Sequence, residues 1–132
     1  MLTGLNHITL AVRDIERSLE FYCRVLGFVG RVKWKTGAYL TLEDVWLCLS
    51  LDDHGSSEDY SHIAFSVEDG KFSRLAEKIA KENIPEWKSN VSEGASLYIL
   101  DPDQHKLELH SGSLESRLES LKSKPYDEMV WL

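Results

Sequence analysis

The sequence predicts an α+β fold built from two consecutive βαβββ modules, and three observations support it. Several short segments alternate apolar and polar residues, which is typical of strands with one buried face. Two longer segments repeat apolar residues at helical spacing. Residues 61–69 also repeat the pattern of residues 6–14, since His, Ile, Val and Asp recur in both at a constant separation of 55 positions. Such a repeat indicates two similar units that need each other to bury a core.

The first module is expected to span residues 1–55 and to begin with a strand at Leu5–Val12. Asp14 is suited to cap the helix that follows, because its carboxylate accepts hydrogen bonds from the first helical turn. Gly27 suits the C-terminal end of that helix. Turn-forming residues then separate three predicted strands, at residues 28–34, 38–42 and 45–51.

A polar linker is expected at about residues 52–59, before the second module at residues 60–112. The repeated strand comes first, and a helix containing Phe72 and Ile79 follows and ends before Pro85. Strands are then predicted at residues 86–88, 96–100 and 105–110. Residues 113–132 are expected to form a C-terminal helix and tail, with Leu114, Leu118 and Leu121 as the buried stripe of the helix.

Composition limits the partners and the compartment. The formal net charge of −7 argues against nucleic acid, which selects basic surfaces. No apolar run approaches the length of about 20 residues that spans a bilayer. Cys23 and Cys48 fall in different predicted elements, and the first residues do not resemble a signal peptide. Free thiols in a reducing cytoplasm are therefore expected.

Three residues suggest a metal site. Strand alternation places His7, His62 and Glu108 on the sheet face opposite the predicted helices. If the two modules curl into one cupped mixed sheet, these side chains line the cup. Imidazole and carboxylate groups suit a divalent ion, and three protein ligands leave coordination positions open for a substrate.

Each of these residues has a simpler interpretation. A single strand histidine is more often a half-buried packing group, and Glu108 between two leucines could face solvent on an edge strand. Lys88 and Arg117 could be ordinary surface charges. The repeat favours the metal interpretation, because His7 and His62 occupy equivalent places in equivalent strands.

Several motifs add a family resemblance. They are Leu2-Thr3-Gly4-Leu5-Asn6-His7, Trp46-Leu47-Cys48-Leu49-Ser50, Glu86-Trp87-Lys88, Asn90, Ser92-Glu93-Gly94 and Leu100-Asp101-Pro102-Asp103. Together they closely resemble the fosfomycin-resistance glutathione transferases of the vicinal oxygen chelate superfamily, over nearly the whole chain. The resemblance implies the vicinal oxygen chelate fold, a domain-swapped homodimer, and addition of the glutathione thiol to the epoxide of fosfomycin.

The resemblance also implies a role for each matching residue. A manganese(II) ion would be held by His7, His62 and Glu108. A potassium ion would be held by a loop comprising Asn90, Ser92, Gly94 and Ser96. The phosphonate of fosfomycin would contact Lys88, Ser92, Tyr98 and Arg117, with Tyr60 beside it. Thr9 would donate a hydrogen bond to the oxygen released from the epoxide ring. The thiol entrance and pocket wall would include Trp34, Tyr39, Trp46, Cys48 and Ser50.

Three positions depart from the family pattern, namely Val91, Ala95 and Gln104. Three other functions also remain open, and one is a related enzyme that uses another thiol, such as bacillithiol or cysteine, with magnesium. A glyoxalase would need a fourth metal ligand, and aligning Leu47-Cys48-Leu49 with Leu107-Glu108-Leu109 puts Cys48 in its place. A metal-free protein of the same fold that sequesters a drug would have no need of two histidines and a glutamate facing one cup.

Overall fold

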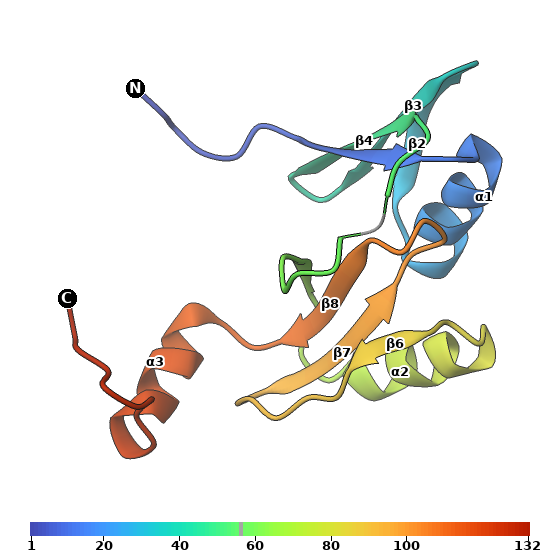
Figure 1. Ribbon diagram of the computed structural model, residues 1–132. Helices are drawn as coiled ribbons and strands as arrows, with labels where there is room; N and C mark the ends of the chain where they lie inside the picture. Colours follow the sequence, from blue (N-terminus) through green and yellow to red (C-terminus); the bar gives the residue numbers. More distant parts are fainter. Residues whose placement is uncertain (56) are drawn as a thin grey trace. The chain divides into compact units, whose positions relative to one another are not determined.

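The computed structural model describes residues 1–55 and 57–132 and contains two compact units. The first unit comprises Met1–Ser61 and Leu100–His105, and the second comprises His62–Ile99 and Lys106–Leu132. Each unit contains a four-stranded mixed sheet (Figure 1). The α+β class with two βαβββ modules is therefore confirmed.

The first unit follows the predicted element order. Strand β1 (Ile8–Val12) lies at one edge of the sheet, which has the order β1-β4-β3-β2. The other strands are β2 (Val29–Trp34), β3 (Gly37–Leu42) and β4 (Val45–Leu51). Strand β1 runs parallel to β4, whereas the two hairpins are antiparallel. The core contains apolar residues from one face of this sheet and from the helical segment, including Val12, Tyr22, Leu40, Leu47 and Leu49.

The helical segment of this unit differs from the single α-helix predicted. Helix α1 (Ile15–Leu19) continues into a π-helix, η1 (Glu20–Val25). Asp14 caps α1 as predicted, because its side chain accepts a hydrogen bond from the Arg17 amide at 2.9 Å. The wider π-helical turn accompanies burial of the adjacent Phe21 and Tyr22. The segment ends at Gly27, whose φ of +87° suits glycine.

The second unit repeats this order. Its strands are β5 (Ile63–Ser66), β6 (Glu86–Lys88), β7 (Ala95–Leu100) and β8 (Lys106–Ser111), in the sheet order β5-β8-β7-β6. Helix α2 (Phe72–Lys81) connects β5 to β6 and buries Ile79. Strand β5 runs parallel to β8, as β1 does to β4.

The C-terminal helix α3 (Leu114–Ser123) begins where predicted, with Ser113 and Ser116 forming a reciprocal cap. The predicted buried stripe is wrong, because only Leu121 is buried. Leu114 is 66% exposed and Leu118 is 37% exposed. An apolar stripe on a helix is buried only where another element covers it. Of the three leucines, only Leu121 is covered within the second unit.

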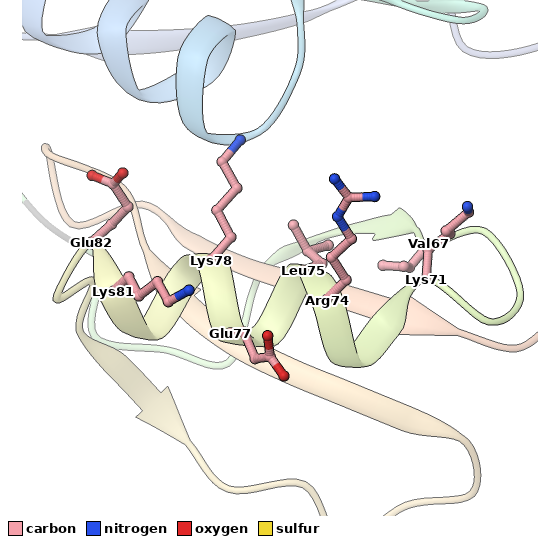
Figure 2. A pocket seen from close by; sticks show the side chains of 8 residues that line it. All are labelled: Val67, Lys71, Arg74, Leu75, Glu77, Lys78, Lys81 and Glu82. Atoms are coloured by element: carbon pink, nitrogen blue, oxygen red, sulfur yellow. The ribbon is translucent and has the colours of Figure 1, made fainter.

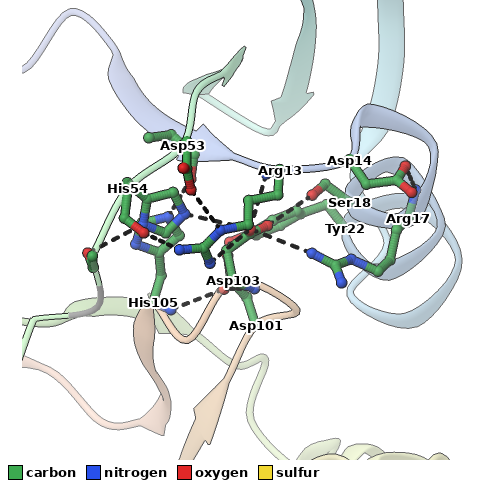
Figure 3. Close-up of polar contacts among 12 residues, drawn as sticks. Arg13, Asp14, Arg17, Ser18, Tyr22, Asp53, His54, Asp101, Asp103 and His105 are labelled. Atoms are coloured by element: carbon green, nitrogen blue, oxygen red, sulfur yellow. Dashed lines mark hydrogen bonds and ion pairs between the residues drawn. The ribbon is translucent and has the colours of Figure 1, made fainter.

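A polar network completes the first unit (Figure 3). The buried Asp103 carboxylate accepts hydrogen bonds from the Arg13 amide at 2.9 Å, the Arg17 guanidinium at 3.3 Å and the Ser18 hydroxyl at 3.4 Å. Asp101 accepts a 2.6 Å hydrogen bond from the Tyr22 hydroxyl. These contacts anchor the turn at residues 101–104 in the first unit.

Two histidines extend the network. His54 Nε2 lies 3.3 Å from Asp103, and the His54 ring stacks on His105 with 4.9 Å between centroids. His105 Nε2 donates to the Ala11 carbonyl at 2.6 Å, since a carbonyl can only accept. Gln104 adopts a φ of +68°, in the left-handed region that glycine most readily occupies, so this turn forms without a glycine at that position.

Candidate metal and substrate site

Glu108 is the centre of the candidate site in the second unit. It lies on β8, between β5 and β7, so it is not on an edge strand. Its neighbours Leu107 and Leu109 are buried in the apolar core, and strand alternation turns Glu108 to the opposite face. Glu108 is only 8% exposed. The solvent-facing interpretation of this residue is therefore wrong.

The side chains that hydrogen-bond to the Glu108 carboxylate include His62, Ser96 and Tyr98. His62 Nε2 lies 3.0 Å from Oε2, and the Ser96 hydroxyl donates to Oε1 at 2.6 Å. Burial raises the pKa of Glu108, but the hydrogen bonds from Ser96 and His62, and the nearby His110, outweigh it. The pKa therefore lies below its ordinary value. The side chain is held as a carboxylate, which is the form that binds metal ions.

His110 is a site residue to which sequence reasoning gave no role, although it shares the polar face of β8 with Glu108. Its Nδ1 lies 2.6 Å from the Ser96 hydroxyl and 3.5 Å from Glu108 Oε1. The signal that could have revealed it is its position two residues beyond Glu108, since alternate strand residues share a face.

The structure brings together Lys88 and Tyr98, two of the residues predicted to bind the phosphonate. Lys88 Nζ is 4.8 Å from the centroid of the Tyr98 ring. Tyr98 is 3% exposed, and its ring contacts Trp87 edge-on at 5.2 Å and His62 at 6.1 Å. The Trp87 and Tyr98 rings therefore form an aromatic wall beside the His62–Glu108 pair.

Arg117 is not a freely solvated charge. Its guanidinium donates to the Glu93 carboxylate at 3.3 Å, the Glu93 carbonyl at 3.1 Å and the Ser92 hydroxyl at 3.4 Å. A hydrogen bond with Tyr126 is the main cause that raises the pKa of Arg117, and Glu93 adds to it. Arg117 and Ser92, both predicted to bind phosphonate, are thus in contact.

The predicted potassium loop is closed by its own hydrogen bonds. The side-chain amide nitrogen of Asn90 donates to the Gly94 carbonyl at 2.9 Å. The side-chain oxygen of Asn90 accepts from the Ser92 backbone amide at 3.0 Å and from the Ser92 hydroxyl at 2.9 Å. Gly94 has a φ of +79°, and a Cβ there would lie 2.7 Å from the Ser111 carbonyl. The structure brings these three predicted residues together. Ser96, the fourth, hydrogen-bonds to Glu108 instead.

The first unit holds the remaining predicted residues. His7 is exposed and directly precedes β1, just as His62 directly precedes β5. Its Nδ1 lies 2.7 Å from the Asn6 side-chain oxygen, and its ring packs 4.6 Å from Trp46. Cys48 is buried and pairs in register with both Thr9 and Tyr39. The surrounding rings form a row in which Tyr39 contacts Trp34 and Trp46.

Tyr60 lies at the end of the first unit and is 57% exposed. Ser50 is also exposed, on β4 opposite Ala11 and Gly37. Both cysteines are free thiols, as predicted.

The donor set fits a divalent ion, but only two of the predicted ligands belong to one unit. The Nε2 atom of His62 and a carboxylate oxygen of Glu108 point at each other, so both could bind one ion in place of their hydrogen bond. His7 belongs to the first unit. Among residues 1–55 and 57–132, no three His, Cys, Asp or Glu side chains gather closely enough to hold a metal ion.

A separate hollow of about 580 Å³ lies along α2 (Figure 2). It contains none of the predicted site residues and is lined by Val67, Lys71, Arg74, Leu75, Glu77, Lys78, Lys81 and Glu82. Its charged side chains have mixed sign and are mostly exposed to solvent, so the hollow lacks the buried polar groups that are typical of a ligand-binding site. In the part of the chain that the structure describes, no helix has the length and apolar character needed to cross a membrane.

Comparison with known proteins supports a single family. Residues 4–109 match the Glyoxalase/Bleomycin resistance protein/Dioxygenase superfamily. The chain is 47% identical to glutathione transferase FosA of Serratia marcescens, over 99% of this chain and 96% of that protein. It is 39% identical to metallothiol transferase FosB of Staphylococcus epidermidis, over 96% of each.

A solved structure gives the same result. It is a mutant of the fosfomycin resistance protein FosX from Listeria monocytogenes, complexed with Mn(II) and 1S,2S-dihydroxypropylphosphonic acid. The TM-score is 0.82 at 27% identity, over 89% of this chain and 99% of that one. The chain therefore belongs to the Glyoxalase/Bleomycin resistance protein/Dioxygenase superfamily and, within it, to the fosfomycin resistance proteins.

Proposed function

We propose that this protein inactivates fosfomycin by adding the thiol of glutathione to the epoxide. The observation that carries the proposal is the arrangement around Glu108. A histidine and carboxylate pair that is suited to a metal ion lies in the same unit as Lys88 and Arg117, two cations suited to a phosphonate. The 47% identity to a glutathione transferase favours glutathione over other thiols.

The metal is inferred to be Mn(II), held by His7, His62 and Glu108. A bound divalent ion would act as a Lewis acid toward the epoxide oxygen, on which negative charge develops as the ring opens. Thr9 lies on β1, two residues beyond His7, and its hydroxyl would donate a hydrogen bond to that oxygen. The FosX structure with Mn(II) supports the choice of metal.

The phosphonate is proposed to bind Lys88, Ser92, Tyr98 and Arg117, with Tyr60 nearby. Arg117 already contacts Ser92, so the two donors are positioned together. Glu93 occupies the Arg117 guanidinium in this structure, and its carboxylate would need to share that cation with the phosphonate. A potassium ion in the loop formed by Asn90, Ser92, Gly94 and Ser96 would add positive charge beside it.

The thiol is proposed to approach along the aromatic row of Trp34, Tyr39 and Trp46, with Cys48 and Ser50 in the pocket wall. Edge-to-face contacts of 4.8 and 5.3 Å hold these rings in fixed orientations. Because His7 and Glu108 belong to different units, we also propose a domain-swapped homodimer, in which each site combines the first unit of one chain with the second unit of its partner. The cytoplasm, where glutathione is abundant and thiols stay reduced, is the proposed location.

The direct test incubates the purified protein with fosfomycin, glutathione, manganese and potassium, and identifies the product by mass. The expected product is the glutathione adduct. A cysteine or bacillithiol adduct formed faster than the glutathione adduct would show that glutathione is not the preferred thiol. A diol, formed by water addition, would contradict thiol transfer.

Variants test the metal ligands separately from the substrate. His7→Ala, His62→Ala and Glu108→Ala should each lower Mn(II) affinity by about a hundredfold or more, because each removes a direct ligand. Near-normal Mn(II) affinity in any of these variants would remove that residue from the site.

A further inference from the structure

The hydrogen-bond chain through Ser96 fixes the proton of His110. A hydroxyl has one proton, and a carboxylate can only accept. The Ser96 proton, 2.6 Å from Glu108 Oε1, therefore points to Glu108. The remaining 2.6 Å contact, between Ser96 Oγ and His110 Nδ1, then requires the histidine to donate. The neutral imidazole must carry its proton on Nδ1.

Two glycines lie against the Cε1 and Nε2 atoms of the His110 ring. A Cβ at Gly94 would lie 2.8 Å from ring atom Cε1, and a Cβ at Gly112 would lie 2.6 Å from Nε2. Gly94 belongs to the loop between Asn90 and Ser96, and Gly112 directly follows β8. The main chain of His110 is also held, because its carbonyl accepts from the Val67 amide at 2.8 Å. The Ser96 contact at Nδ1 and the close packing at Cε1 and Nε2 together restrict the orientation of the ring.

We propose that His110 is a positioning residue for Glu108 and for the loop of residues 90–96. Its Nδ1–H turns the Ser96 hydroxyl so that the serine proton is directed to Glu108. Its ring packs against Gly94, so the carboxylate and the loop are held through the same side chain. Ser96 donates its proton to Glu108 and accepts from His110 with one lone pair, so it retains one lone pair for any cation in the loop. The inference rests on the proposed metal site and assigns it a supporting residue.

The tautomer can be measured on the unaltered, metal-free protein. Nitrogen-15 NMR of the imidazole groups distinguishes the two neutral tautomers. His110 should show a protonated Nδ1 and an unprotonated Nε2. The opposite tautomer would overturn the proposal, and this readout depends on neither activity nor a folded variant.

Two variants separate the hydrogen bond from the packing. His110→Phe keeps a ring against the glycines but removes Nδ1, whereas His110→Asn keeps a nitrogen donor near that position and removes the ring. Mn(II) binding, followed by electron paramagnetic resonance, should weaken by about 10- to 100-fold in His110→Phe. His110→Asn should retain most of the affinity, and thermal melting shows whether each variant is folded.

The proposal fails if folded His110→Phe binds Mn(II) as tightly as the parent, or if folded His110→Asn binds no better than His110→Phe. Should neither variant fold, the tautomer of the unaltered protein decides. Failure of the proposed function would look different. The fosfomycin adduct would be absent, while the tautomer and the effects on Mn(II) binding would stand.

Discussion

Cys48 and Glu108 occupy equivalent positions in the two sheets. On β4, Cys48 pairs with Thr9, two residues after His7; on β8, Glu108 pairs with Ala64, two residues after His62. Both side chains are nearly buried, at 7% and 8% exposure. The register thus confirms the alignment inferred from the sequence. At the position where a glyoxalase would need a carboxylate as its fourth metal ligand, this chain has the thiol of Cys48. This difference argues against glyoxalase chemistry.

Cys48→Glu should therefore lower the rate of fosfomycin conjugation by about tenfold or more, because a second carboxylate would occupy a coordination position meant for substrate. Cys48→Gln has nearly the same shape without the charge and should lower the rate less. Conjugation rates and Mn(II) affinities of both variants give the comparison. Equal losses in the two variants would mean that volume, not a new ligand, is responsible.

Asp103→Asn should destabilise the protein by about 2–4 kcal/mol, because a fully buried carboxylate that accepts from Arg13, Arg17 and Ser18 loses its charge. Asp53 is the matched control. It also pairs with Arg13, at 3.2 Å, but its side chain is 97% exposed. Asp53→Asn should leave the urea midpoint nearly unchanged. Similar midpoints for the two variants would show that the buried network is not a main source of stability.

Gly94→Ala should destabilise the protein by about 1–3 kcal/mol and reduce its response to potassium, because the left-handed backbone and the close Ser111 carbonyl oppose a side chain. Gly55→Ala is the control, since a Cβ there meets nothing within 4 Å.

Replacing potassium with sodium should slow the parent enzyme, because the smaller ion fits the same oxygens poorly, and Ser96→Ala should blunt this difference. Equal rates of the parent in the two salts at one ionic strength would indicate that the loop is only a turn.

His7→Ala and Glu108→Ala should complement each other when mixed, unfolded and refolded together. In a mixed domain-swapped dimer both lesions fall in one site and the other site is intact. With random pairing, about a quarter of normal activity should return. Sites built within one chain would all carry a lesion, so an inactive mixture with confirmed subunit exchange would disprove the shared site.

Stability should fall at alkaline pH through Tyr22. Burial, followed by the neighbouring Asp101 carboxylate, raises the pKa of Tyr22 well above its ordinary value of about 10. The folded protein then keeps the phenol proton at a pH where the unfolded chain releases it. The contribution is fully present below about pH 10 and is lost as the pH rises further.

Urea unfolding across this range should show the loss, and Tyr22→Phe should have a flatter pH dependence, although it is less stable at neutral pH without the hydrogen bond to Asp101. If the variant and the parent show the same alkaline slope, Tyr22 is not the titrating group.

Much of the fold was predictable because the repeat is local in sequence. The 55-residue separation of His7 and His62 identified equivalent strands, and Asp14 and Gly27 marked the ends of the first helical segment. The π-helix was not predictable, since an apolar pattern does not reveal the change in hydrogen bonding that lets Phe21 and Tyr22 both turn inward. The exposure of Leu114 and Leu118 was missed because burial depends on a covering element, not on the helix itself.

The same distinction applies to the site. Strand alternation identified the face that carries Glu108, His62 and Ser96. It could not show that Ser96 would hydrogen-bond to Glu108, or that His110 would hold Ser96 from the other side. Contacts of this kind depend on side-chain orientation across strands. The hydrogen bond between Asp103 and Arg13 joins residues 90 positions apart, and no local sequence pattern predicts such a pair.

The placement of residues 100–105 in the first unit has a consequence for synthesis. A ribosome releases residues 62–99, most of the second sheet, before it releases the turn that contains Asp101 and Asp103. Until then, the Tyr22 hydroxyl and the Arg13 amide lack the acceptors that they have in the finished protein. We therefore expect the first unit to complete its folding only after residues 100–105 have been released, although most of it is made first. A protease should digest nascent chains that end near residue 99 more readily than chains extended beyond residue 105.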